Sequence, residues 1–180
     1  DTMRAPLSVY SALCGDAAAI FTPSLLGVVL NADRIEIDGA GYGRFTGDAF
    51  STYGYVVGGN DLVVSQTTAA NPVQVAGDAF AAAGRLDGGN DRLFAAASTA
   101  PHTMAGDVFS ATEGTQVTGG DDDIRGGSAG DTLYGDVERA MGTFQGGTDV
   151  IRGYGGNDVI AGDGVLFVGA FDPAAPQIHA

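Results

Sequence analysis

The chain has 180 residues, which is enough for one domain with a hydrophobic core. Its formal net charge of −14 argues against the basic face that nucleic-acid binding requires. The chain also has no run of 18 or more apolar residues, the length that a membrane-spanning helix needs. Aspartate supplies 19 of the 22 acids and arginine all eight basic residues, a bias that favours turns and oxygen-ligand metal sites. An acidic surface tuned for solubility is the alternative explanation of this charge.

Residues 1–30 are expected to form an N-terminal cap or the first coil of a repeat. The most apolar stretch, AAAIFTPSLLGVVL at 17–30, is interrupted by Pro23 and Gly27 and lacks the positively charged start of a signal peptide. Cys14 has no second cysteine to pair with inside the chain, so burial is its expected state.

Two short phrases alternate along residues 31–164, and the second begins as early as residue 13. The first joins a glycine pair to an aspartate and a later aliphatic residue: GGNDLV at 58, GGNDRL at 88, GGDDDI at 119, GGTDVI at 146 and GGNDVI at 155. NADRIEI at 31 aligns with them. The second phrase ends in Gly-Asp, at 15, 47, 77, 106, 135 and 162, with successive spacings of 32, 30, 29, 29 and 27 residues. Such a period predicts stacked structural repeats.

Each repeat has positions for short strands and tight turns. The glycines are expected to permit positive φ in the turns, and one aliphatic residue per short strand to face inward. Two inward ladders follow: Leu13, Phe45, Val75, Met104, Leu133, Ile160, and Ile35, Val63, Leu93, Ile124, Ile151. The sequence therefore predicts an all-β, right-handed parallel β-solenoid (β-roll) of about five to six coils in a single domain, residues 1–180. An antiparallel sandwich would explain the short strands but not the period.

Stacking brings equivalent aspartates close together. Residues one coil apart lie about 4.8 Å from each other, so the aspartates of the glycine-pair phrase would repel by roughly 3 kcal/mol per neighbouring pair at an effective dielectric of about 20. Arginine is too scarce to neutralise them, and the chain has no cluster of His or Cys. Carboxylates and turn carbonyls are hard oxygen ligands, which favours Ca²⁺ over Mg²⁺ with its stricter octahedral geometry.

The repeats resemble the RTX family, the hemolysin-type calcium-binding repeats with the pattern G-G-x-G-x-D-x-U-x. The best matches are GGSAGDTLY at 126, GYGGNDVIA at 153 and FQGGTDVIR at 144. The resemblance implies a calcium-bound β-roll in a secreted bacterial protein, exported by a type I system. The candidate metal ligands are the carboxylates of Asp33, Asp61, Asp91, Asp122, Asp131, Asp149 and Asp158, and the carbonyls of Gly59, Gly89, Gly120, Gly147 and Gly156.

The sequence departs from this pattern in two ways. Most coils have 27–32 residues rather than the 18 of two nonapeptides, so the excess forms either a third short face or a bulging loop. The second edge has its aspartate only at Asp131 and Asp158, and we expect a single site there, with His102 in a loop. The six Gly-Asp aspartates either accept hydrogen bonds in their own turns, which is favoured, or complete the sites.

Enzyme motifs such as H-E-x-x-H, G-x-S-x-G and the P-loop are absent, so no catalytic residue is predicted. The expected function is an extracellular, calcium-binding structural repeat protein. Uncharged apolar segments near the ends, FTPSLLGVVL at 21 and GVLFVGAF at 164, suggest head-to-tail contact with other copies in a fibre, surface layer or matrix, with 165–180 as a tail. The alternative is the calcium-folded repeat or secretion module of a larger secreted toxin, protease, lipase or adhesin.

Overall fold

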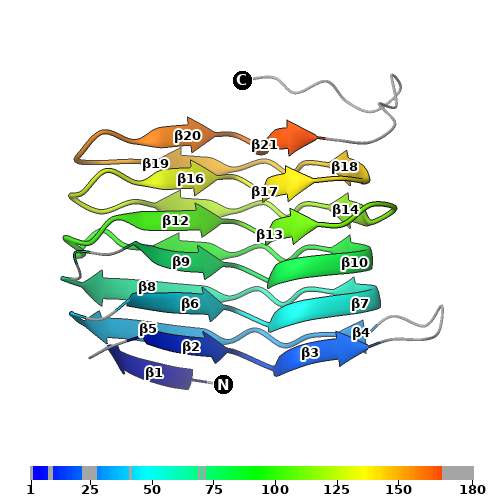
Figure 1. The fold of residues 1–180 in the computed structure, drawn as a ribbon, viewed down its shortest axis with the longest axis horizontal. Coiled ribbons are helices and arrows are strands. Elements are labelled where there is room, and N and C mark those ends of the chain that lie inside the picture. The colour runs from blue at the N-terminus through cyan, green and yellow to red at the C-terminus, as the bar shows by residue number, and fades with distance from the viewer. Residues whose placement is uncertain are drawn as a thin grey trace.

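The chain folds as a parallel β-solenoid of about five coils, stacked along one axis from β1 to β21 (Figure 1). This is a computed structural model, and it describes residues 2–7, 10–21, 28–40, 42–68, 70 and 72–167. Every element within those residues is a strand. The described part of the chain therefore contains no helix long and apolar enough to cross a membrane. The predicted fold class is confirmed.

Three sheets run the length of the solenoid, and every pairing joins strands of neighbouring coils in parallel. Sheet A contains β1 (Thr2–Leu7), β5 (Arg34–Gly39), β8 (Leu62–Thr67), β11 (Arg92–Phe94), β15 (Asp123–Arg125) and β19 (Val150–Arg152). Sheet B contains β2 (Tyr10–Cys14), β6 (Tyr42–Thr46), β9 (Val73–Ala76), β12 (His102–Ala105), β16 (Thr132–Tyr134) and β20 (Val159–Ala161). Sheet C contains β3 (Ala17–Phe21), β4 (Val28–Val29), β7 (Ala49–Val57), β10 (Ala79–Asp87), β13 (Val108–Ala111), β14 (Gln116–Thr118), β17 (Val137–Ala140), β18 (Thr143–Gln145) and β21 (Gly164–Phe167).

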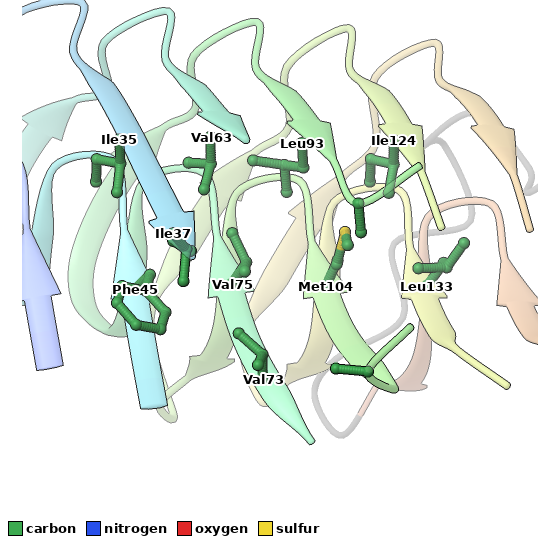
Figure 2. Packing of buried hydrophobic residues seen from close by; sticks show 12 residues of the cluster. Ile35, Ile37, Phe45, Val63, Val73, Val75, Leu93, Met104, Ile124 and Leu133 are labelled. Carbon is green, nitrogen blue, oxygen red and sulfur yellow. The ribbon is translucent and has the colours of Figure 1, made fainter. Parts of the chain in front are cut away.

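The two predicted ladders are the core between sheets A and B. Phe45 pairs in register with Val75, and Val75 with Met104, while Ile35, Val63 and the later members pair likewise in sheet A. Figure 2 shows the two rows facing each other along the axis. The middle members are fully buried, so each coil supplies two apolar side chains to one continuous core.

The extra residues of each coil form a third face, sheet C, rather than a loop. Gly54 and Gly84 pair in register within β7 and β10, and Gly114 lies between β13 and β14. All three have positive φ, from 78° to 110°, which side chains with a Cβ rarely adopt. The residues on either side of these glycines pack together as a second core, with members such as Ala82 and Leu86.

The ends of the chain are only partly described. The first coil is β1 to β4, and its strands β1, β2 and β3 pair in parallel with the second coil. The predicted apolar segment at 21–30 includes residues 22–27, which lie outside the described residues, as do residues 168–180 of the predicted tail. The last described strands of sheets A and B are β19 and β20.

Candidate metal centre

Two connections in each coil carry aspartates, and both lie between the two apolar cores. The chain leaves sheet B for sheet C through the Gly-Asp turn, and leaves sheet C for sheet A through the glycine-pair turn. We call the aspartates after the glycine pair the GGxD column and those of the other turn the Gly-Asp column. The GGxD column is Asp33, Asp61, Asp91, Asp122 and Asp149, and the Gly-Asp column is Asp16, Asp48, Asp78, Asp107, Asp136 and Asp163.

The GGxD column is held by the backbone of the preceding coil. The N–H of Asp61 donates to Oδ1 of Asp91 at 2.7 Å, and the N–H of Asp91 donates to Oδ1 of Asp122 at 2.7 Å. The same bond joins Asp33 to Asp61 and Asp122 to Asp149. The five aspartates predicted as one column of ligands therefore form one column, with each carboxylate one coil from the next.

The Gly-Asp column faces the glycine-pair turn of its own coil. The N–H of Gly59 donates to Asp48 at 2.9 Å, and the N–H of Gly147 donates to Asp136 at 3.1 Å. Gly89 and Gly120 donate to Asp78 and Asp107 in the same way. The favoured prediction placed these bonds within the Gly-Asp turn, but the donors belong to the opposite turn, 11 to 13 residues along the chain.

The two columns meet in groups of three carboxylates. In each group one GGxD aspartate lies with two consecutive Gly-Asp aspartates, and one oxygen from each lies within 4.8 Å of the others. The groups are Asp16, Asp33, Asp48; Asp78, Asp91, Asp107; Asp107, Asp122, Asp136; and Asp136, Asp149, Asp163. The Gly-Asp aspartates, which sequence reasoning left outside the predicted ligand set, are therefore two of every three.

Close approach, rather than positive φ, explains the glycines of these turns. A Cβ on Gly106 would lie 1.7 Å from Oδ2 of Asp122 and 1.8 Å from the carbonyl oxygen of Gly135. A Cβ on Gly119, the first of a glycine pair, would lie 1.8 Å from Oδ1 of Asp136. Positive φ is not found at these glycines, so the prediction of left-handed turns is wrong here, and the missing side chain leaves room for a carboxylate.

The middle members of the columns, such as Asp61, Asp91 and Asp122, are buried and take part in none of the arginine ion pairs that the structure gives. Asp78 and Asp107 are 0% exposed and Asp91 is 1% exposed. Each arginine ion pair lies with an acid outside the columns, on the outer faces: Arg4 with Asp38, Arg34 with Glu36, Arg85 with Asp87, and Arg125 and Arg152 with Asp123. Buried carboxylates without a compensating charge are costly.

The pKa values of the columns reflect this burial. Burial, with the charge of Asp48 as the second cause, raises the pKa of Asp61 to about 8. Burial likewise raises the pKa of Asp48 to about 7, of Asp122 to about 8 and of Asp136 to about 9. In metal-free protein these carboxyls hold protons that exposed aspartates would have lost.

Burial is also the first cause at the centre of the columns. The pKa values of Asp78, Asp91 and Asp107 are raised well above the ordinary value by burial and then by the charges of neighbouring column members. The pKa of Asp149, nearer the end, rises only to about 6, again chiefly through burial. Asp149 is only half-buried, so its smaller rise agrees with burial as the main cause.

Several column oxygens lack any hydrogen-bond partner although they are buried. They are Oδ1 of Asp48 and Oδ2 of Asp61, Asp91, Asp122 and Asp136. For Asp91, Oδ1 accepts from the backbone, and Oδ2 lies against Gly77, the residue before Asp78. The free oxygens of the GGxD column thus face the Gly-Asp column, where a cation with oxygen ligands would satisfy them.

The predicted carbonyl ligands lie in two places. Four of them stack one above another along the axis: Gly59, Gly89, Gly120 and Gly147. The contact is close, since a Cβ on Gly89 would lie 1.5 Å from the carbonyl oxygen of Gly59, and the next two pairs repeat this arrangement. Gly156 lies apart from them, at the connection from sheet A to sheet B, with φ of 105°. The structure therefore brings four of the five carbonyls to the columns.

The second edge holds a pair of aspartates rather than a column. The N–H of Asp131 donates to Oδ1 of Asp158 at 2.9 Å, and the N–H of Gly127 donates to Oδ2 of Asp131 at 2.6 Å. Among the described residues no third acid, His or Cys joins them in a three-ligand group. Asp131 and Asp158 remain predicted ligands at a site separate from the double column.

His102 occupies this edge one coil earlier, and its predicted place in a loop is wrong. It is the first residue of β12, is 1% exposed, and its Nε2 lies 2.8 Å from Oγ of Ser65. Its N–H donates to Asp131, whose Oδ1 also lies 3.6 Å from Nδ1. This Ser-His-Asp set resembles that of a hydrolase, but all three residues are at most 1% exposed, so a substrate could not reach Ser65.

Comparison with known proteins found no relative: no family model, curated protein or solved structure matches the chain.

Proposed function

We propose that this protein is a calcium-binding structural solenoid, whose coils are held together by cations between buried aspartates. The observation that carries the proposal is the set of buried, unpartnered carboxylate oxygens in the two columns. A protein interior tolerates buried charges only when they are neutralised or coordinate a metal. Asp61, Asp91, Asp107 and Asp122 take part in none of the arginine ion pairs, so only protons or bound cations can neutralise them, and a cation keeps the site neutral at a pH where the protons are lost.

The ligand chemistry supports Ca²⁺. Carboxylates dominate the groups, and glycine carbonyls lie beside them, so all the candidate ligands are hard oxygens. Ca²⁺ accepts six to eight oxygens in flexible geometry, whereas zinc and copper sites use nitrogen and sulfur. The RTX resemblance favours the same ion, since the repeats of that family bind calcium through aspartates after glycine-rich turns.

An extracellular location follows from the same proposal. The RTX resemblance implies a secreted protein exported by a type I system. A chain that needs many cations to neutralise its interior folds best where calcium is abundant, as it is outside cells. The proposed role is structural rather than enzymatic, because the arrangement of the acids follows the repeat and the one triad-like set of residues is buried.

Head-to-tail association is the second part of the proposal, and the last coil supports it. Ile160 of β20 is 51% exposed, whereas its register partner Leu133 is fully buried, and Val159 beside it is 57% exposed. Apolar residues at the end of a solenoid are covered by a capping segment or by another copy. If a cap covers them, the alternative role as the repeat module of a larger secreted protein is favoured.

Removal and return of calcium test the main proposal. Circular dichroism spectra and melting curves of the full chain at pH 8 are compared after metal removal and after addition of millimolar CaCl₂, with MgCl₂ as the matched salt control. We expect β-structure and the melting temperature to rise with calcium and much less with magnesium. Identical curves in all three conditions, from protein that carries no metal, would contradict it.

A further inference from the structure

The Gly-Asp column is the part of the site that the RTX-like pattern does not assign. In the sequence its aspartates fit an ordinary role in turns, and each accepts a backbone hydrogen bond from the opposite turn. That bond does not account for their position. Asp48, Asp78, Asp107 and Asp136 are 0% exposed, and one carboxylate follows another from coil to coil; only the end members, Asp16 and Asp163, are exposed or half-buried.

The grouping repeats with a shift of one coil. Asp107 lies in one group with Asp91 and in the next with Asp122, and Asp136 likewise lies in two consecutive groups. One step earlier along the columns, Oδ2 of Asp61 lies against Gly47, the residue before Asp48, in the same way as Oδ2 of Asp91 lies against Gly77, and Asp78 continues the column. The repeat therefore defines five positions, one for each GGxD aspartate, and four of them are groups with oxygens within 4.8 Å.

We propose that the two columns hold a single axial file of five divalent cations, each bound by one GGxD aspartate and bridged to the next cation by a Gly-Asp aspartate. This inference rests on the proposed function and adds the number, position and coupling of the ions. A carboxylate has two oxygens and can ligate two ions at once, so Asp107 and Asp136 bridge neighbouring ions. Ions in such a file do not bind independently.

Charge balance supports the number five. The two columns contain eleven aspartates, five in one and six in the other, and carry eleven negative charges when ionised. Five divalent cations supply ten positive charges and leave the buried layer with one net negative charge. Ions at the GGxD turns alone, without the Gly-Asp carboxylates as ligands, would leave the buried Asp48, Asp78, Asp107 and Asp136 without any neutralising cation.

The unpartnered oxygens are an independent sign of a ligand here. Oδ2 of Asp91 and Oδ2 of Asp122 are buried and accept no hydrogen bond, and each lies against the glycine of the facing Gly-Asp turn, Gly77 and Gly106 respectively. These oxygens therefore face the interior between the columns rather than the outer side of the glycine-pair turn. The ions are accordingly placed between the two apolar cores and not at the surface of the turns.

Calcium counting in single variants tests the bridging role. Calcium bound per chain is measured by elemental analysis after equilibration in CaCl₂ and removal of free ion. We expect the unmodified chain to bind the five ions of the file in addition to any ion at Asp131 and Asp158. Asp107→Ala, which removes a ligand shared by two groups, should bind two ions fewer, and Asp122→Ala, whose carboxylate belongs to one group, should bind one fewer. Asp121→Ala is the matched control: Asp121 is the exposed neighbour of Asp122 in the same turn, and its loss should release no ion.

The outcomes separate this inference from the proposed function. If the unmodified chain binds no calcium, the proposed function fails and the file with it. If it binds calcium but Asp107→Ala and Asp122→Ala release equal numbers of ions, calcium binding stands and the bridging file is wrong. Should Asp107→Ala not fold, anomalous scattering from crystals of the unmodified protein grown with CaCl₂ decides: peaks in one row between the columns support the file, and peaks only at the outer turns overturn it.

Discussion

Metal-free protein should lose stability steeply as the pH rises from 5 to 8. The folded-state pKa values of Asp61 and Asp122 lie above the value of about 3.8 that an exposed aspartate has, so the folded chain binds more protons than the unfolded chain between these values. Stability then falls as pH rises through this window, and the contribution of bound protons is gone above the folded-state pKa. This is opposite in sign to the usual aspartate in a salt bridge.

Asp61 and Asp122 set the magnitude. Each has a pKa of about 8 through burial, so in the folded chain each keeps its proton up to about pH 8. In the unfolded chain the same carboxyls have lost their protons by pH 5, and each pH unit between pH 5 and pH 8 therefore lowers the free energy of unfolding. Three pH units at about 1.4 kcal/mol per unit amount to roughly 4 kcal/mol for each residue. Two such residues change the free energy of unfolding by about 8 kcal/mol, which is comparable to the whole stability of an average domain at about 5–15 kcal/mol.

The assay is thermal unfolding followed by circular dichroism, on protein freed of metal by dialysis against a chelator and then exchanged into metal-free buffer. At roughly 2–4 °C per kcal/mol for a chain of this size, the melting temperature at pH 8 should lie at least about 15 °C below that at pH 5. Calcium should raise the melting temperature more at pH 8, where protons compete less for the carboxylates.

Asp61→Asn provides the internal check on this reasoning. The variant should lose about half of the pH dependence attributed to the two residues, whereas Asp121→Asn, an exposed residue outside the columns, should keep all of it. A metal-free protein that melts at the same or a higher temperature at pH 8 than at pH 5 would show that the buried carboxyls are not protonated as their burial requires.

Three further predictions concern other parts of the molecule. Gly106→Ala should lower the free energy of unfolding by roughly 3 kcal/mol or more, measured from the melting temperature, because its Cβ would overlap Oδ2 of Asp122. Gly162→Ala is the control: it occupies the same turn position in the last coil with open space around it, and it should change the free energy of unfolding by less than about 0.5 kcal/mol. His102→Ala should destabilise the fold by about 2–4 kcal/mol without changing the calcium count, because it removes the hydrogen bond to Ser65 and leaves a cavity in place of a buried side chain; a lost ion would place His102 in the metal site. Deletion of residues 168–180, which follow β21, should leave the calcium-loaded chain folded but abolish any polymer seen by sedimentation, and polymers that persist would exclude this segment as the joining one.

The apolar ladders could be predicted from the sequence because each depends on one strong local signal. An aliphatic residue recurs at a fixed distance from Gly-Asp or from the glycine pair, and parallel stacking preserves that distance from coil to coil. Phe45, Val75 and Met104 therefore fall in register although their neighbours differ. Nothing beyond the period of the repeat was needed to place them.

Sheet C could not be assigned in the same way. Its strands are rich in small residues, as in AFAAAGRLD of β10, and small side chains give little hydrophobic contrast between the two faces of a strand. The glycine in the middle, Gly84, also suggests a loop when only the sequence is known. Its positive φ and its register with Gly54 identify it instead as a bend between two halves of one sheet.

Of the two columns of aspartates, only the GGxD column was predicted from the sequence. The GGxD aspartates were expected in one column, but the sequence does not show that the Gly-Asp turn faces the glycine-pair turn across the interior, because that depends on how sheet C folds back. One signal was present. Asp48 precedes Gly59 by the same 11 residues that separate Asp78 from Gly89, and Asp136 from Gly147. This recurring offset indicates that the acid and the glycine N–H can face each other, although Asp107 and Gly120 make the same hydrogen bond at an offset of 13 residues.

The position of the acids between two apolar cores bears on why a chain would keep them. A buried carboxylate adds less to stability than an apolar residue of similar size would, unless it is paired, and this chain repeats the unfavourable choice in every coil. Since both cores, around Leu93 and around Leu86, are supplied by every coil, additional apolar packing was available as a means of stabilisation. The acids make folding depend on what is bound to them. With neither protons nor cations bound, the ionised carboxylates of neighbouring coils repel one another, and with cations bound, the same carboxylates join one coil to the next. The proposed ion file thus makes the stability of the whole stack depend on the surrounding calcium concentration, which an apolar interior could not do.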